Sequence, residues 1–188
     1  MSRLLEIQHS TISPCRISVP ALVAGFFRDE RPLRGSAGLL DWRLNGYVSR
    51  LLETERLSGE SNESTLVASQ GRLPSNVALF VGLGGRSLYG FNQITNVISD
   101  VTRTLQKLQI DEFALEIPGA RPLSLDPAES AYNTVKGIVK ILSASAPEIA
   151  RMRVTLLEPE SVTARLRFGL RKAQSNFQGR VQIALGAA

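Results

Sequence analysis

The stretch NVALFVGLGGRSLYGFN, residues 76–92, decides the fold. It opens with five apolar residues, 77–81, a run that is typical of a strand buried on both faces. Gly82, Gly84 and Gly85 then turn the chain into a polar loop. A helix is predicted to begin near Asn92, because one apolar stripe recurs at helical spacing: Ile94, Val97, Ile98, Val101, Leu105 and Leu108. A buried strand, a glycine turn and an amphipathic helix form the repeating step of an α/β domain.

The rest of the chain repeats this alternation. Apolar runs predict strands at 3–8, 19–27, 65–69, 113–117 and 152–157, and apolar periodicity predicts helices at 41–55 and 161–177. Asp41 is expected to cap the first of these helices, and Asp126-Pro127 starts another, with proline at the first helical position. The segment 181–185 is expected to be an edge strand or a docked tail. We therefore expect a mostly parallel or mixed central sheet with helices on both faces.

Composition excludes several classes of protein and site. The 188 residues contain no apolar run near the roughly 20 needed to cross a bilayer, and the N-terminus lacks a signal pattern. A cytoplasmic location without membrane attachment is therefore expected. One cysteine, Cys15, and one histidine, His9, exclude an internal disulfide and the usual zinc sites. No catalytic residue, metal site or cofactor is predicted from these residues.

The positive charge lies at the C-terminal end. Residues 151–188 hold seven basic and two acidic residues, whereas 1–150 hold 15 of each sign, so the whole net charge of +5 falls in the last segment. We divide the chain into an N-terminal extension or edge strand (1–18), an α/β domain (19–157), and a basic helix with a short apolar tail (158–188) that packs on the same domain.

Three segments resemble one family in order and spacing. They are VPALVAGFFRDERPLRGSAGLLDWRLNGYVSRLL, SGESNESTLVAS, and the stretch from NVALFVGLGGRSLYGFN to EFALEIPG. Together, over residues 19–157, they are similar to the N-terminal domain of the cytosolic leucyl aminopeptidases. The resemblance implies a three-layer macro-like α/β fold. It also implies relatives that assemble into hexamers, so self-association or pairing with a protein partner is expected here.

The resemblance does not carry catalysis with it. In that family the chemistry belongs to a C-terminal domain with two metals, marked by an Asn-Thr-Asp-Ala-Glu-Gly-Arg-Leu run that this sequence lacks. No metal ligand or catalytic residue can be transferred, and we expect a non-catalytic binding or assembly module.

The glycine loop has two interpretations. Successive N–H groups at Gly82, Gly84 and Gly85, with Arg86 beside them, could bind a phosphate, as macro domains bind ADP-ribose. Gly119 and Arg121 follow the next strand, and would lie at the same sheet edge. However, position 87 is Ser rather than the Gly of a dinucleotide fingerprint, so the favoured interpretation is a simple turn after a buried strand.

The C-terminal helix has one apolar stripe and one basic surface. The stripe, Val162, Leu166, Leu170, Ala173 and Phe177, is expected to dock on the domain. The opposite surface carries the candidate partner-binding residues Arg165, Arg167, Phe168, Arg171 and Lys172. An ordinary solvated basic helix remains the alternative. If this surface binds something, a protein is favoured, while nucleic acid or a nucleotide is a less favoured partner.

Overall fold

The computed structural model describes residues 3–144 and 151–186 of the chain. Its strands are β1 (Leu4–Ser10), β2 (Ala21–Phe26), β3 (Ser64–Ala68), β4 (Val77–Gly82), β5 (Glu112–Leu115), β6 (Arg151–Leu157) and β7 (Gln182–Leu185). Its helices are α1 (Gly35–Arg43), α2 (Tyr47–Glu53), α3 (Phe91–Lys107), α4 (Pro127–Ala144) and α5 (Thr163–Phe177), with short 3₁₀ turns η1 (Arg86–Leu88) and η2 (Glu160–Val162).

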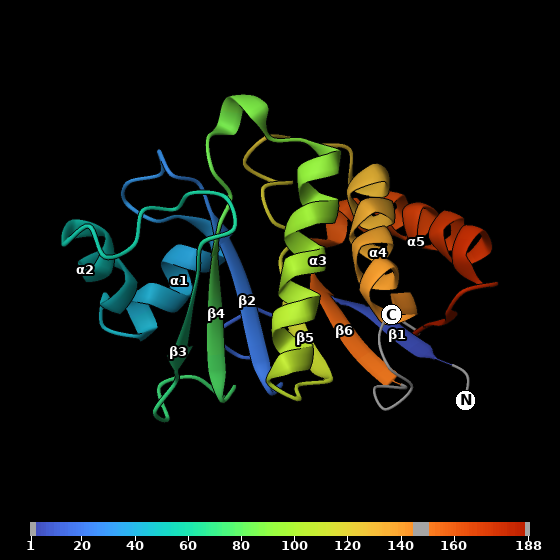
Figure 1. Cartoon of the computed structure of the whole chain (residues 1–188), viewed down its shortest axis with the longest axis horizontal. Coiled ribbons are helices and arrows are strands. Elements are labelled where there is room, and N and C mark those ends of the chain that lie inside the picture. Colours follow the sequence, from blue (N-terminus) through green and yellow to red (C-terminus); the bar gives the residue numbers. More distant parts are fainter. Residues whose placement is uncertain (1–2, 145–150, 187–188) are drawn as a thin grey trace.

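One mixed sheet organises these elements, in the order β3-β4-β2-β5-β6-β1-β7. Only β3 runs antiparallel to its neighbour, and the other pairs are parallel. The prediction of a mostly parallel or mixed sheet with helices on both faces is confirmed. β1 is an interior strand between β6 and β7, while β7 forms one edge of the sheet. The loops that follow β2, β4 and β5 lie in the upper part of Figure 1.

One face of the sheet carries the larger core. The helices α3, α4 and α5 lie side by side over it (Figure 1) and bury one continuous apolar cluster that includes Leu79, Ile98, Val135, Leu156 and Leu166. The helices approach closely at glycines. A Cβ on Gly169 of α5 would lie 2.0 Å from the Ala128 carbonyl oxygen of α4. The predicted docking of α5 through Leu166 and Leu170 is confirmed, since both side chains are buried.

The other face has a smaller core beneath α1 and α2. Most of its members come from β2, β3, β4, the two helices and the nearby loops, among them Phe26, Phe80, Leu40 and Val48. Because this core is centred on β2 and β4, the strands β6 and β1 lie beyond these helices.

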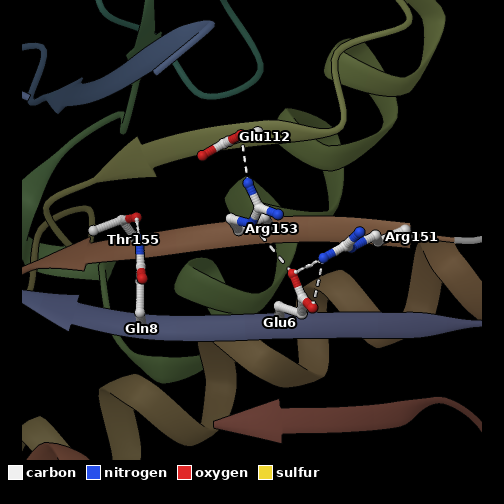
Figure 2. A network of polar contacts seen from close by, with 6 residues as sticks. All are labelled: Glu6, Gln8, Glu112, Arg151, Arg153 and Thr155. Carbon is white, nitrogen blue, oxygen red and sulfur yellow. Dashed lines mark hydrogen bonds and ion pairs between the residues drawn. The ribbon is translucent and has the colours of Figure 1, made fainter. Parts of the chain in front are cut away.

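On that side β1, β6 and β5 carry polar side chains instead (Figure 2). Glu6 accepts hydrogen bonds from Arg151 at 2.8 Å and from Arg153 at 3.2 Å, and Arg153 also pairs with Glu112 at 3.0 Å. Hydrogen bonding from Arg151, and then from Arg153, holds the pKa of Glu6 below its usual value. Alternation along the strands sends these side chains to one face and the apolar residues to the other.

The predicted helix 41–55 is wrong as a single element. Asn45 and Gly46 adopt positive φ angles of 57° and 67°, so α1 ends and α2 begins within this stretch. Asp41 lies inside α1, and its Oδ1 accepts from the N–H of Val48 at 2.7 Å. The aspartate therefore caps α2 rather than its own helix. The Asn-Gly pair was the overlooked turn signal.

Smaller differences concern element ends. Segment 181–185 forms the edge strand β7 rather than a docked tail, and α5 begins at Thr163 because η2 occupies residues 160–162. Among the described residues, no helix has both the length and the apolar character needed to cross a membrane.

Candidate functional site

The first candidate site is a cavity of about 390 Å³ where β2, β4 and β5 end. Its wall includes three arginines, Arg34, Arg86 and Arg121, and two glutamates, Glu30 and Glu116. The predicted residues Arg86, Gly119 and Arg121 are brought together here, whereas Gly82, Gly84 and Gly85 are not part of the wall.

The glycines of the predicted loop face a neighbouring turn. The N–H groups of Gly82, Leu83 and Gly84 donate to the carbonyls of Glu63, Phe26 and Gly59, respectively, at 2.8–2.9 Å. Gly84 has a φ of 72°, and a Cβ there would lie 2.4 Å from Ser61 Oγ. The N–H groups of Gly82 and Gly84 are therefore already satisfied within the fold and are not free to bind a phosphate.

Two of the three arginines of this cavity, Arg86 and Arg121, have internal partners. Arg86 lies over the ring of Phe27 at 5.1 Å and is 3.5 Å from carboxylate oxygens of Asp29 and Glu30. Arg121 pairs with Glu116 at 2.6 Å. Each of these cations is therefore partly neutralised before any ligand arrives.

Glu116 also occupies the N-terminus of α1. Its Oε2 accepts from the backbone N–H of Ser36 at 3.1 Å and from the Ser36 hydroxyl. A helix N-terminus favours an anion, and here an internal carboxylate provides it. An external anion at this place would have to displace Glu116. In the described chain only Arg34, of the three arginines in the wall, makes no ion pair or side-chain hydrogen bond.

Gly119 is required by packing. It has a φ of 72°, and a Cβ would lie 2.4 Å from the ring of Tyr89. The Tyr89 hydroxyl donates to the Pro118 carbonyl oxygen at 2.9 Å, and burial raises the pKa of this phenol. The tyrosine thus fixes the loop after β5 against the loop after β4.

The outer surface of α5, the second candidate site, contains both neutralised and free cations. Arg165 pairs with Asp126 at 2.6 Å, a contact that lowers the pKa of Asp126, and Lys172 pairs with Glu129 at 2.7 Å. Asp126 immediately precedes α4, and Glu129 lies in the first turn of this helix. No ion pair within the described residues involves Arg167 or Arg171. Phe168 is 61% exposed, as predicted for a residue opposite the docking stripe.

A third surface was missed by sequence reasoning. Ile12, Leu39 and Trp42 are 51%, 48% and 71% exposed, and they line one shallow groove. Arg16 and Arg43 belong to the same groove, which has no carboxylate in its wall. We call these five residues the Trp42 groove. A signal was present, since Trp42 is the one tryptophan of the chain and lies outside the apolar periodicity of the predicted helix 41–55, which is formed by Leu44, Tyr47, Val48, Leu51 and Leu52.

The guanidinium of Arg43 lies 5.1 Å from the centre of the Trp42 ring. This contact orients the indole while leaving it accessible. Neither Arg16 nor Arg43 forms an ion pair with a described residue. The groove is therefore an apolar patch with an uncompensated positive rim.

Sequence comparison relates the chain to the N-terminal part of an aminopeptidase family. The model of the cytosol aminopeptidase family, N-terminal domain, matches residues 23–142. A probable cytosol aminopeptidase of a Geobacter species is 29% identical over 133 residues, which cover 71% of this chain and 27% of that protein. One from Alkaliphilus metalliredigens is 26% identical over 99 residues, covering 53% and 20%. The chain thus spans less than a third of the length of these curated relatives.

Solved structures show the same fold at low identity. A tomato leucine aminopeptidase mutant superposes with a TM-score of 0.67 and 15% identity, covering 95% of this chain and 38% of that one. The Oceanobacillus iheyensis macrodomain with ADP has a TM-score of 0.69 and 10% identity, covering 89% and 91%. The predicted macro-like fold is confirmed. Because the family model covers more than half of the residues, the chain belongs to the cytosol aminopeptidase family and corresponds to the N-terminal domain of that family.

Proposed function

We propose that this domain is a non-catalytic module that binds a protein partner. The Trp42 groove carries the proposal, because large apolar side chains converge there with free arginines. Aromatic residues and arginine are the residues most enriched at the centres of protein interfaces. A single exposed apolar side chain needs no explanation, but a groove lined by three large exposed apolar side chains does.

The charge of the groove selects the partner. Arg16 and Arg43 have no carboxylate beside them in the groove, so the matching occupant is an apolar protein segment flanked by Asp or Glu. A symmetric contact between two copies through this surface would bring four arginines together. Self-association through the Trp42 groove is therefore the less favoured arrangement.

The outer surface of α5 supports the same function. Phe168, Arg167 and Arg171 repeat the combination of an exposed aromatic ring with free guanidinium groups. Arg165 and Lys172 contribute less, because Asp126 and Glu129 already neutralise them.

The sole tryptophan makes the groove directly observable. We expect a synthetic Glu-Glu-Leu-Phe-Glu-Glu peptide to shift Trp42 emission to shorter wavelength and to protect it from acrylamide. A Lys-Lys-Leu-Phe-Lys-Lys peptide should do neither. Arg16→Glu with Arg43→Glu should abolish the response, whereas Arg56→Glu, which changes another exposed arginine, should preserve it. An equal response to both peptides would contradict the proposal.

Self-association is tested separately. Sedimentation of the unmodified chain, Trp42→Ala and Phe168→Ala reports the oligomeric state of each. If the unmodified chain is a dimer and Trp42→Ala is a monomer, the groove pairs two copies and the acidic partner is the wrong choice.

The non-catalytic part rests on the match to the N-terminal region of the aminopeptidases. We expect no hydrolysis of leucyl substrates by this chain with added zinc or manganese. Turnover that is lost on chelation would contradict this expectation.

Nucleotide binding is the second candidate function. The cavity at the ends of β2, β4 and β5 is large enough for a small ligand, and a similar macrodomain was solved with ADP. The pairing of Arg86 and Arg121 with carboxylates weighs against it. Calorimetry with ADP-ribose should show no binding, and a Kd below about 100 μM, roughly −5.5 kcal/mol, would favour the nucleotide instead.

Nucleic acid is a weaker candidate, because α5 offers only two free arginines on its outer surface. Nucleic acid would be favoured if binding weakened steeply with salt concentration. The double variant Arg167→Glu with Arg171→Glu should then show a smaller dependence of affinity on salt.

A further inference from the structure

A second cavity, of about 360 Å³, lies where β5 and β6 end, beside the first. Most of its wall is apolar and comes from three elements: the loop before α4, the start of α4, and the turn that leads into α5. Leu125, Pro127, Val162 and Leu166 are representative. Its size suits a small molecule with an aliphatic body.

Glu158, the residue that follows β6, brings a carboxyl group into this wall. The residue is only 5% exposed, and its Oε1 accepts the N–H of Ile117 at 2.9 Å. Oε2 has no hydrogen-bond donor among the described residues. Burial raises the pKa of this carboxyl to about 7. The carboxyl therefore keeps one oxygen without a protein donor at the wall of a mostly apolar cavity.

A second unmet acceptor lies in the same wall. Ser130, near the start of α4, is fully buried, and no donor or acceptor within the described chain reaches its Oγ. Buried polar atoms normally have partners, and an unpaired one needs an explanation.

The local charges favour a cation. The charged groups that act on Glu158 are Glu116, which raises its pKa, and Arg121, which lowers it. Arg121 is paired with Glu116 at 2.6 Å. Arg121 also lines this cavity, with its charge balanced by Glu116, and His9 on β1 contacts the Glu158 backbone carbonyl and not the carboxyl. When Glu158 is ionised, the group carries one uncompensated negative charge.

We propose that this cavity binds a small primary ammonium ion with a short aliphatic body, whose N–H groups donate to Glu158 Oε2 and Ser130 Oγ. An ammonium group has three donors and no acceptor, which matches two oxygens that lack donors. The aliphatic part replaces water against Leu125, Val162 and Leu166. This site uses none of the residues of the Trp42 groove, so its test is independent of the test of the proposed protein-binding function.

The pH dependence follows from the carboxyl. Binding needs ionised Glu158, and this fraction rises about tenfold between pH 6 and pH 8 for a pKa of about 7. The ammonium itself stays charged over this range. Affinity should therefore increase about tenfold, and binding near pH 7 should release protons.

The experiment titrates the full chain with 3-methylbutylamine while recording amide resonances. The Ile117 amide donates to Glu158, so its shift reports the carboxyl in the free protein and in the complex. We expect saturable binding that is tighter at pH 8 than at pH 6. The Ile117 resonance should also report a lower apparent pKa for the Glu158 carboxyl in the complex than in the free protein. 3-Methylbutan-1-ol, with the same body and no charge, should bind at least tenfold more weakly.

Two variants sharpen the result. Glu158→Gln keeps the shape, and should remove both the binding and its pH dependence. Glu160→Gln makes the same chemical change two residues away on an exposed side chain, and should leave the affinity unchanged. Equal binding of amine and alcohol, unchanged affinity in Glu158→Gln, or a Kd above about 10 mM at pH 8 would each overturn the proposal.

Discussion

The two faces of the sheet are stabilised in different ways. The face beneath α3, α4 and α5 is a continuous apolar core, whereas β6 and β1 carry ion pairs around Glu6 and Arg153 on the opposite face. The same strands supply both, since alternate residues point to opposite sides. Burial is therefore expected to dominate stability on the first face, and partly exposed charges to contribute little on the second.

The largest effect is expected where α5 meets the core. Leu166→Asp places a carboxylate at a fully buried position within a cluster of apolar side chains. We expect a loss of more than about 4 kcal/mol, enough to leave much of the chain unfolded. Urea unfolding followed by circular dichroism measures it. Near-native stability would show that α5 is not part of the core.

Glu158 directly follows β6, where the carboxyl ends of the parallel strands lie. Its contribution to the free energy of unfolding depends on pH. Burial raises its pKa from 4.5 to about 7, so the folded state holds the proton after the unfolded state has lost it. Stability therefore falls as pH rises from about 4.5 to 7 and is constant above that range. We expect Glu158→Gln to gain up to about 3 kcal/mol relative to the unmodified chain at pH 8, and little at pH 4.5.

This second prediction is checked by urea unfolding at both pH values, with Glu160→Gln as the control. A stabilisation of equal size at the two pH values would mean that the charge of Glu158 is not its cause.

A smaller effect is expected on the polar face. Glu6→Gln weakens the contacts to Arg151 and Arg153, which are both partly exposed. We expect the melting temperature to fall by no more than a few degrees at neutral pH. The difference should shrink in 1 M salt and below the lowered pKa of Glu6, where the carboxyl is protonated. A large, salt-independent loss would make this face as important as the helical one.

The smallest effect is expected at Phe168. Its ring is 61% exposed, so Phe168→Ala should change the free energy of unfolding by less than about 0.5 kcal/mol. Thermal melts of Phe168→Ala and Leu166→Asp compare two positions of one helix that lie two residues apart. A fall of several degrees for Phe168→Ala would show that the ring contributes to the fold, and would remove it from the proposed binding surface.

Local sequence patterns were sufficient to predict most of the fold. The run 77–81 followed by glycines, the stripe of α3, and Asp126-Pro127 before α4 depend on residues close in sequence, so periodicity and capping rules could predict them. The same holds for the exposed position of Phe168 opposite Leu166 and Leu170. The error at 41–55 also had a local cause, because the left-handed Asn45-Gly46 turn breaks an otherwise helical apolar pattern.

Only the tertiary structure decided which polar groups are available. Sequence reasoning placed Arg165 and Lys172 with the free cations, but Asp126 and Glu129 of α4 neutralise them from about 40 residues away. It also could not find the cavity of Glu158 or the groove of Trp42, because each joins segments that are distant along the chain. The sequence by itself determined the α/β pattern, the family and the buried stripe of α5, since these follow from local periodicity and motif order. Ion pairing, burial of a carboxyl and convergence of exposed apolar side chains depend on distances between elements, which are set only when the sheet and its helices pack together.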